Sequence, residues 1–517
     1  MQDTIRRMIP VIMILCLIWP VPSEARVKPA PVFQSHMVLQ RDMPISVWGT
    51  AEAGELVRAS LGKEEKEVRA NQKGEWILVF PRQKASYDPV ELVVNELVFT
   101  DILIGEVWIC SGQSNMAWVV GKSDIPDKRE IIDNRDIRYL KLVGPKGVAK
   151  DGYTREELAR CKPDEFFKGR WTHGTSDRIP LFSALGWMFA QNLAADLDVP
   201  VGIIEIAVGG SAINNWLPPE ITRSHPYTSH MYQEDWLTNT KVFINHRRRG
   251  REAFQHVLKK DEPFIPGAME YRWMCEPSFL YEAGMETLGK LGIRGLAWYQ
   301  GESDAYSREP VIQYPELFRQ FIASVRKEFR NERLPVLFVQ LPGHKPETWP
   351  LFREMQRQVS QSERDVYMAV AIDLGEEDNI HPRDKTQIGN RLSALALKHV
   401  YHRKGQPDFP ELEKIKIKAE GLELAFSNCG KGLTGTGKPV PHFELAGADS
   451  VFVPVEASVI SRTKIRVKPG GIQAEYIRYG WKSFPKPEVR VYNSEGFPLG
   501  PFIESLKSGE SERIKTR

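Results

Sequence analysis

Residues 105–118 read GEVWICSGQSNMAW, and this stretch predicts the centre of the fold. The bulky apolar residues from Val107 to Cys110 are typical of a strand buried in a parallel sheet, and Gly112 permits the sharp turn that ends such a strand. Ser114 is then expected at the carboxyl end of the strand, where open α/β sheets place their ligand sites. Ser114 is therefore the candidate nucleophile, although Met116 stands where the G-x-S-x-G elbow requires a second glycine.

A serine nucleophile needs a base, and the candidate base lies far downstream in a loop rich in glycine and proline. Asp378 and His381 are three residues apart in this loop. Such a loop can place the imidazole of His381 over Ser114 and hold the Asp378 carboxylate against the other ring nitrogen. We therefore predict a catalytic triad of these three residues. His344 is the rival base, but it has no nearby aspartate, and we expect it in a rim loop that lines the acyl or sugar pocket.

Four short blocks follow one another in an order that is similar to the SGNH (GDSL-like) hydrolases. They are GQSNM at 112–116, VGGSAINNW at 208–216, WYQGESD at 298–304 and DNIH at 378–381. Together they resemble the bacterial sialate O-acetylesterase group of that superfamily. The segments 33–55 and 477–502 also resemble the two ends of that group, so the resemblance covers nearly the whole mature chain.

The resemblance implies a serine esterase that transfers an acetyl group to water and needs no metal or organic cofactor. The backbone N–H of Ser114, the backbone N–H of Gly209 and the side-chain amide of Gln300 are then the expected oxyanion donors. Glycine at position 209 suits this role because it lets the backbone approach a substrate oxygen closely. Many SGNH enzymes carry an asparagine in the third block, and here Gln300 is the nearest amide. Glu302 either orients its neighbours or, as is more common for an acidic residue at a strand end, serves as a cap or salt-bridge partner.

An O-acetylated sugar is the substrate that the resemblance implies, with sialic acid as the name-giving case. Deacetylation of acetyl-xylan or mannan is the alternative within the same chemistry. A non-catalytic glycan-binding protein is the alternative from another class. The chain carries 70 basic and 67 acidic residues, so its charges nearly cancel and nothing favours a nucleic-acid partner.

The first 25 residues are typical of a secretory signal peptide. Arg6 and Arg7 precede an apolar run from 8 to 21, and Ser23-Glu24-Ala25 offers a cleavage site between small residues. We expect export to the periplasm or the outside of the cell. No other run in the sequence is long enough to cross a bilayer, so no integral membrane segment is expected after the signal is removed.

Four cysteines remain after signal removal, in a chain long enough to rely on its core. Four thiols allow three full pairings, and none has a C-x-x-C spacing, so any disulfide is optional and no metal site is expected. The four are Cys110, Cys161, Cys275 and Cys429.

The chain of 517 residues is long enough for two or three domains, and its 42% hydrophobic and 26% charged residues describe an ordinary globular protein. Residues 26–100 predict a β-sandwich in which Trp48 and Trp76 either bind a glycan or, as we favour, pack inside. Residues 101–404 predict an α/β domain, a parallel sheet with helices on both faces. Residues 405–517 predict a second β-rich module.

An insertion interrupts the predicted α/β domain at residues 217–272, and we expect it to be irregular or helical and to lie near the mouth of the site. It contains the basic cluster His246-Arg247-Arg248-Arg249. A basic cluster is usually a solvated face, and contact with an anionic sugar is the alternative.

Overall fold

The computed structural model describes residues 27–125, 131–259, 262–435, 439–485 and 491–506, and the predicted signal peptide lies outside these ranges. Its centre is an open sheet in which every neighbouring pair is parallel except the edge pair β10 and β9. This confirms the predicted α/β sheet. The strand order is β10 (Trp171–Gly174), β9 (Asn134–Leu142), β11 (Val201–Ala207), β8 (Leu97–Gly112), β12 (Gly295–Tyr299), β13 (Val336–Val339) and β14 (Val366–Ala369).

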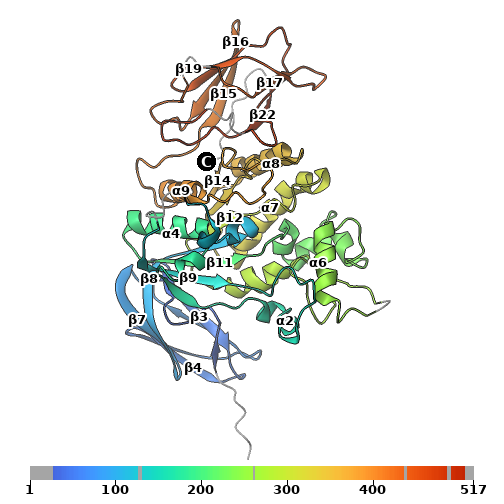
Figure 1. Cartoon of the computed structure of the whole chain (residues 1–517). Coiled ribbons are helices and arrows are strands. Elements are labelled where there is room, and N and C mark those ends of the chain that lie inside the picture. Colours follow the sequence, from blue (N-terminus) through green and yellow to red (C-terminus); the bar gives the residue numbers. More distant parts are fainter. Residues whose placement is uncertain (1–26, 126–130, 260–261, 436–438, 486–490, 507–517) are drawn as a thin grey trace, which may run out of the picture.

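Helices cover both faces of this sheet, as predicted (Figure 1). Trp108 of β8 packs edge-on against Phe189 with ring centroids 5.1 Å apart. Trp298 of β12 is aligned with Ser111 rather than with Trp108, so it points to the opposite face, where it packs 4.4 Å from Phe321. The first face carries α4 (Ala184–Leu197) and α9 (Thr386–Leu395), and the second carries α7 (Arg308–Glu328) and α8 (Trp349–Ser362).

The N-terminal module is joined to the central sheet by a shared strand. The strand β8 has 16 residues, and its first half pairs with the module while its second half lies in the central sheet, so the expected boundary at residue 100 falls inside one strand. Trp48 and Trp76 are buried, 7% and 3% exposed, which agrees with packing rather than glycan binding. The module contains β1 (Lys28–Pro29), β2 (Val38–Gln40), β3 (Ile45–Thr50), β4 (Leu56–Leu61), β5 (Glu64–Arg69), β6 (Glu75–Phe80) and β7 (Ser86–Val94).

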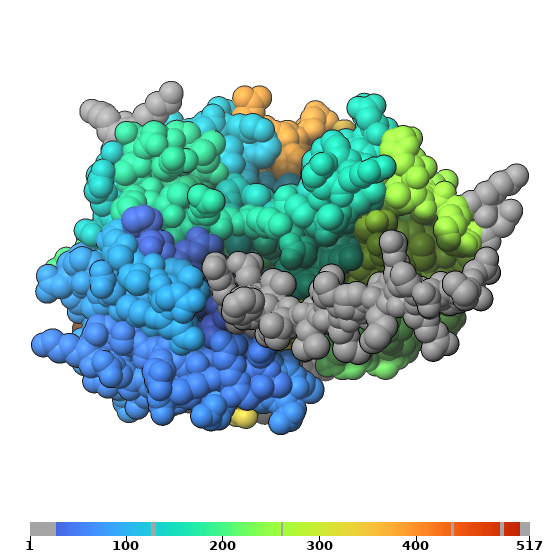
Figure 2. Space-filling model, turned by 90° about the horizontal axis from the view of Figure 1, so that it is seen from below, coloured from blue at the N-terminus to red at the C-terminus, as the bar shows by residue number. Residues whose placement is uncertain are grey.

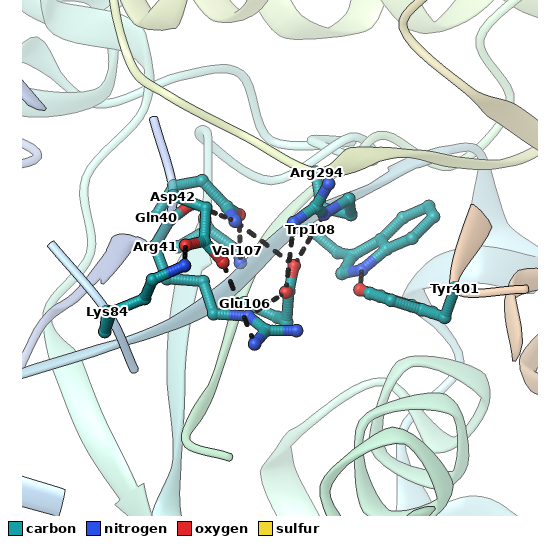
Figure 3. A network of polar contacts seen from close by, with 9 residues as sticks. All are labelled: Gln40, Arg41, Asp42, Lys84, Glu106, Val107, Trp108, Arg294 and Tyr401. Carbon is teal, nitrogen blue, oxygen red and sulfur yellow. Dashed lines mark hydrogen bonds and ion pairs between the residues drawn. The ribbon is translucent and has the colours of Figure 1, made fainter. Parts of the chain in front are cut away.

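A buried carboxylate fastens the module to the start of the central sheet (Figure 3). Glu106 of β8 is fully buried and binds Arg294 at 2.8 Å, Arg41 of the module and the Gln40 amide at 3.2 Å. Burial alone raises the pKa of Glu106, but the hydrogen bonds and charges of Arg294 and Arg41 outweigh it and hold the pKa below its usual value. The carboxylate therefore stays ionised and holds three chain segments together.

The C-terminal module folds around its own apolar core and lies at the top of Figure 1, opposite the N-terminal module. Arg353 of α8 is fully buried and donates to the carbonyls of Lys482 and Ser483, which ties the module to the central domain. Its two four-stranded sheets contain β15 (Glu411–Lys418), β16 (Gly421–Ser427), β17 (Phe443–Ala446), β18 (Val453–Pro454), β19 (Ala457–Ser461), β20 (Lys464–Val467), β21 (Tyr476–Tyr479) and β22 (Phe502–Ser505).

The segment 217–272 is partly helical and otherwise irregular, as expected. Seen from below, the N-terminal module lies on one side of the molecule and the yellow-green end of this segment on the other (Figure 2). It contains α5 (Pro219–Ser224), η5 (Ser229–Tyr232) and α6 (Ile244–Phe254). The remaining short elements are α1 (Ser114–Ala117), η1 (Val120–Lys122), α2 (Arg155–Ala159), α3 (Pro163–Phe166), η3 (Ile179–Leu181), η4 (Ile213–Trp216), η6 (Tyr281–Glu286) and η7 (Ala396–Val400).

Two chain-wide features bear on the predictions. Within the described ranges, no helix combines the length and the apolar character that crossing a bilayer requires. All four cysteines that follow the predicted signal peptide are buried free thiols, so the optional disulfides are not formed.

Candidate active site

The turn after β8 carries Ser114, as predicted. Gly112 has a φ of 134°, and a Cβ atom there would lie 2.1 Å from the carbonyl oxygen of Tyr299, so only glycine fits. The backbone N–H of Gln113 donates to the same carbonyl at 2.9 Å. These contacts fix the turn against β12, and the short helix α1 begins at Ser114, which is half-buried.

His381 meets Ser114 although 267 positions separate them in the chain. Nε2 of His381 lies 2.8 Å from Oγ of Ser114, within reach of a direct hydrogen bond. The imidazole also stacks on the ring of Trp118, with centroids 5.3 Å apart and an interplanar angle of 18°. In the neutral tautomer with a bare Nε2, the serine hydroxyl donates to the imidazole, which is the arrangement that general-base activation needs.

Asp378 does not lie where the triad prediction placed it. Its side chain is 84% exposed, and Oδ1 accepts a hydrogen bond from Lys345 at 3.1 Å. No described residue forms a hydrogen bond with Nδ1 of His381. The backbone of this loop is held instead by Asn379, whose side chain bonds both the N–H and the carbonyl of His381 at 3.0 and 2.8 Å. A surface lysine therefore competes with the imidazole for the Asp378 carboxylate.

A buried lysine lies close to Ser114 and His381, bound to the neighbouring Asn115. Lys385, the residue before α9, is fully buried, and desolvation lowers its pKa to about 7 against the opposing pull of Glu302. The pKa of His381 is also lowered, first by desolvation and then by the positive charges of Lys385 and His344. A depressed pKa keeps the imidazole of His381 neutral, and thus able to accept a proton, at neutral pH.

Asn115, the residue after the candidate nucleophile, links the turn that carries Ser114 to the loop that carries His381. The side-chain amide of Asn115 donates to Glu302 and, at 2.9 Å, to the carbonyl of Ile380 next to His381, while its Oδ1 accepts from Lys385 at 2.7 Å. Glu302 is 1% exposed, and burial raises its pKa. Through Asn115, Glu302 is connected to the backbone next to His381, a contact that suits the orienting role rather than that of a cap.

Two of the expected oxyanion donors, the backbone N–H groups of Ser114 and Gly209, belong to residues that lie close together. Gly209 is exposed, and a Cβ atom there would lie 3.5 Å from Cβ of Ser114, so the two residues are neighbours. Neither the Gly209 N–H nor the Ser114 N–H has an acceptor among the residues that the structure describes. Both are therefore open to a substrate oxygen, as the oxyanion prediction requires.

The Gln300 amide, the third expected donor, is engaged inside the protein. Its nitrogen lies 2.6 Å from Oδ2 of Asp304 and 3.1 Å from the carbonyl of Ser211, and the residue is fully buried. Burial raises the pKa of Asp304 to about 7. The structure does not offer the Gln300 amide to Ser114, because both of its N–H groups already have internal acceptors.

The rival base, His344, is buried beneath the C-terminal module. Its ring lies 5.1 Å from that of Trp349, and its backbone N–H donates to Ser483 at 2.9 Å. Desolvation lowers the pKa of His344. Among the described residues, His381 is the imidazole that contacts the Ser114 hydroxyl.

One group of potential metal ligands occurs within the described ranges, at the junction of the N-terminal module and the sheet edge. His36, Asp101 and His173 place their ligand atoms within 4.8 Å of one another. The guanidinium of Arg138 lies 2.6 Å from Asp101 and 2.5 Å from His173. The Arg138 guanidinium is therefore bound among these three side chains, and the cluster is an ion-pair network in this structure.

Sequence reasoning missed the residues that support the catalytic pair. Trp118 and Asn115 stand in the same stretch as Ser114, so their proximity was the available signal. Lys385 carried none, since a lysine before a helix is ordinarily solvated.

The chain is similar to known proteins over most of its length. Residues 265–398 match the family described as carbohydrate esterase, sialic acid-specific acetylesterase. The chain is 26% identical to the sialate O-acetylesterase of Mus musculus, covering 92% of this chain and 94% of the mouse protein. It is 23% identical to the sialate O-acetylesterase of Homo sapiens, covering 92% of each. A crystal structure of a carbohydrate acetylesterase from Xanthomonas citri is 25% identical, with a TM-score of 0.73, and the match covers 93% of this chain and 99% of that one.

Proposed function

We propose that this protein, a carboxylic ester hydrolase of the sialate O-acetylesterase family, removes O-acetyl groups from sialic acids. The observation that carries the proposal is the 2.8 Å contact between the Ser114 hydroxyl and His381 at the carboxyl end of the central sheet. The relatives named sialate O-acetylesterase cover more than nine-tenths of the chain, which supports the choice of substrate.

The reaction is acyl transfer to water in two steps. Ser114 attacks the acetyl carbonyl while Nε2 of His381 takes its proton. The imidazolium then protonates the departing sugar oxygen, which leaves an acetyl-enzyme. Water enters, gives a proton to His381 and attacks the acetyl carbon, and Ser114 leaves with that proton.

The oxyanion of each tetrahedral intermediate binds in the space beside Ser114. We assign its donors to the backbone N–H groups of Ser114 and Gly209, each worth about 3 kcal/mol in comparable hydrolases. Gln300 joins them if its amide exchanges an internal acceptor for the oxyanion when substrate binds. Asp378 completes the triad by leaving Lys345 for Nδ1 of His381, because hydrogen bonds of this kind commonly tighten only when substrate is bound.

Two alternatives set the design of the test. Deacetylation of xylan or mannan uses the same Ser114 chemistry on a neutral sugar, and the Xanthomonas citri neighbour carries the broader description of a carbohydrate acetylesterase. A glycan-binding protein without activity would retain binding and release no acetate. We also propose that the protein belongs to the bacterial branch of this family, because its four sequence blocks resemble that branch. Residues 1–25, which are typical of a signal peptide, lead us to propose that it is exported.

The test measures acetate release from p-nitrophenyl acetate, from 9-O-acetyl-N-acetylneuraminic acid and from acetylated xylan. We expect the sialic acid to be preferred over xylan, and Ser114→Ala to lower kcat by at least about 1,000-fold and to abolish labelling by a serine-directed phosphonate. Ser224→Ala, at an exposed serine of α5, is the matched control and should be unchanged. Activity that survives in Ser114→Ala would show that the nucleophile is elsewhere, and release from xylan alone would favour the second substrate.

A further inference from the structure

Three consecutive arginines in α6 differ in how they are bound. Arg247 donates to the carbonyl of Val242 at 3.0 Å, and Arg248 forms an ion pair with Glu252 at 2.7 Å. Arg249 has no hydrogen bond or ion pair with any residue that the structure describes, and its Nε atom is buried without an acceptor. A buried donor without a partner is uncommon and costs stability, so it calls for an explanation.

The guanidinium of Arg249 lies against the turn formed by Gly209 and Gly210. Its Nη1 atom is 3.1 Å from the position that a Cβ atom would take on Gly210, the residue after the expected oxyanion donor Gly209. Gly209 in turn neighbours Ser114. Because consecutive Cα atoms are about 3.8 Å apart, Nη1 lies at most about 14 Å from Cβ of Ser114.

One hydrogen bond ties α6 to Gly210, and a second one fixes Gly210 from the other side. His246, one helical turn before Arg249 and on the same face, contacts the carbonyl of Gly210 with Nε2 at 2.5 Å. Ser303, from the block after β12, donates to the same carbonyl at 2.9 Å. In Figure 1, α6 stands in the lobe beside the central sheet. The contact of His246 with Gly210 therefore places Arg249, one helical turn further along α6, beside the residue that follows the expected oxyanion donor Gly209.

Sialic acid differs from the neutral alternatives in its charge. It is a nine-carbon sugar acid, and an acetyl ester on its glycerol side chain lies at the opposite end of the molecule from its carboxylate. A guanidinium matches a carboxylate with two parallel hydrogen bonds. We propose that Arg249 binds the substrate carboxylate and thereby selects acidic over neutral acetylated sugars. This inference rests on the proposed function, since it names how the same site reads its substrate.

The test compares two substrates that differ only in that charge, 9-O-acetyl-N-acetylneuraminic acid and its carboxyl methyl ester, by acetate release. We expect the wild type to prefer the free acid. Arg249→Met should lower kcat/KM for the free acid by about 10- to 100-fold, mainly through KM, and change kcat/KM for the methyl ester and for p-nitrophenyl acetate less than about 3-fold. The kcat/KM of Arg249→Lys for the free acid should lie between those of the wild type and Arg249→Met, because lysine keeps the positive charge but cannot form two parallel hydrogen bonds with a carboxylate.

Arg251→Met is the matched control, since it removes an equal charge from an exposed position of the same helix, and it should leave all three rates unchanged. Equal losses on the free acid and the methyl ester would overturn the proposal, as they indicate a distorted site. A wild type that hydrolyses both equally would overturn it while leaving the sialate esterase function intact. A wild type that releases acetate from p-nitrophenyl acetate and from neither sialate would remove the proposed function, and the role of Arg249 with it.

Discussion

Nζ of Lys385 donates a 2.7 Å hydrogen bond to Oδ1 of Asn115, the residue that directly follows the nucleophile. The same asparagine donates to the carbonyl of Ile380, directly before His381. Asn115 thus connects the buried ammonium of Lys385 to the loop that carries His381. Because Lys385 is charged at pH values below its pKa of about 7, its field acts on His381 in the range where that imidazole titrates.

Replacing Lys385 by methionine should move the acid limb of the pH profile. Removing the positive charge relieves the depression of the His381 pKa, so protonation of the base begins at a higher pH and kcat/KM falls more at pH 5.5 than at pH 8. The measurement is kcat/KM for p-nitrophenyl acetate from pH 5 to 9. Lys398→Met, in the turn η7 that directly follows α9 and about 20 Å from Lys385 by the rise of the helix, should leave the profile unchanged. A profile that does not shift in Lys385→Met, or that shifts to lower pH, contradicts the electrostatic role.

Replacing Asn115 by alanine should slow catalysis without weakening substrate binding. The substitution cuts the tie between the serine turn and the His381 loop and leaves Lys385 without its acceptor. We expect kcat to fall about 10- to 100-fold with KM nearly unchanged, and the free energy of unfolding to fall by about 2 to 3 kcal/mol. Asn192→Ala, which removes two hydrogen bonds to Asn390 and Ser393 of α9, is the control. A loss confined to KM would indicate a binding role instead.

The parts of the site that sequence reasoning predicted are those that local pattern determines. An apolar run that ends at Gly112 predicts both a buried strand and a serine at its carboxyl end, and Asp-x-x-His predicts a loop that carries a base. Asn115 and Asp378 form hydrogen bonds with residues far away in the sequence, and Arg249 has no hydrogen-bond partner among the described residues. No local sequence pattern predicts either situation. The strands β9 and β10 were not predicted, because β10 is a short strand of four residues at the sheet edge and the charged sequence of β9, NRDIRYLKL, lacks a continuous apolar run.

Asp378 provides the sharpest test of the triad. We expect Asp378→Asn to lower kcat at least about 100-fold, because an amide cannot stabilise the imidazolium and favours the wrong tautomer of His381. Lys345→Met, which removes the competing ion pair, should not lower kcat. The control is Glu377→Gln at the exposed neighbouring position. If Asp378→Asn retains more than a third of the activity, Ser114 and His381 act as a pair without an acid.

The four buried thiols should be inert in the folded protein. Burial raises the pKa of Cys161 and Cys275 to about 12, so almost no thiolate is present at neutral pH. We expect an alkylating reagent to label the four cysteines, Cys110, Cys161, Cys275 and Cys429, only after the protein has been unfolded, as peptide mapping would show. A reducing agent should leave Tm unchanged. A disulfide-linked pair of peptides from the native protein would contradict the free thiols.

The ion pairs of Glu106 should make stability depend on pH in a defined direction. Glu106→Gln leaves Arg294 and Arg41 without their buried carboxylate, and we expect it to lower the free energy of unfolding by about 3 to 5 kcal/mol at pH 7. The folded pKa of Glu106 lies below its ordinary value of 4.5, so its contribution is complete above that value and is lost as the pH falls through the folded pKa. Urea unfolding of both proteins between pH 3 and 7 should therefore show a gap that narrows on acidification. A gap that is constant or that widens in acid would mean that the variant acts through packing rather than through the carboxylate charge.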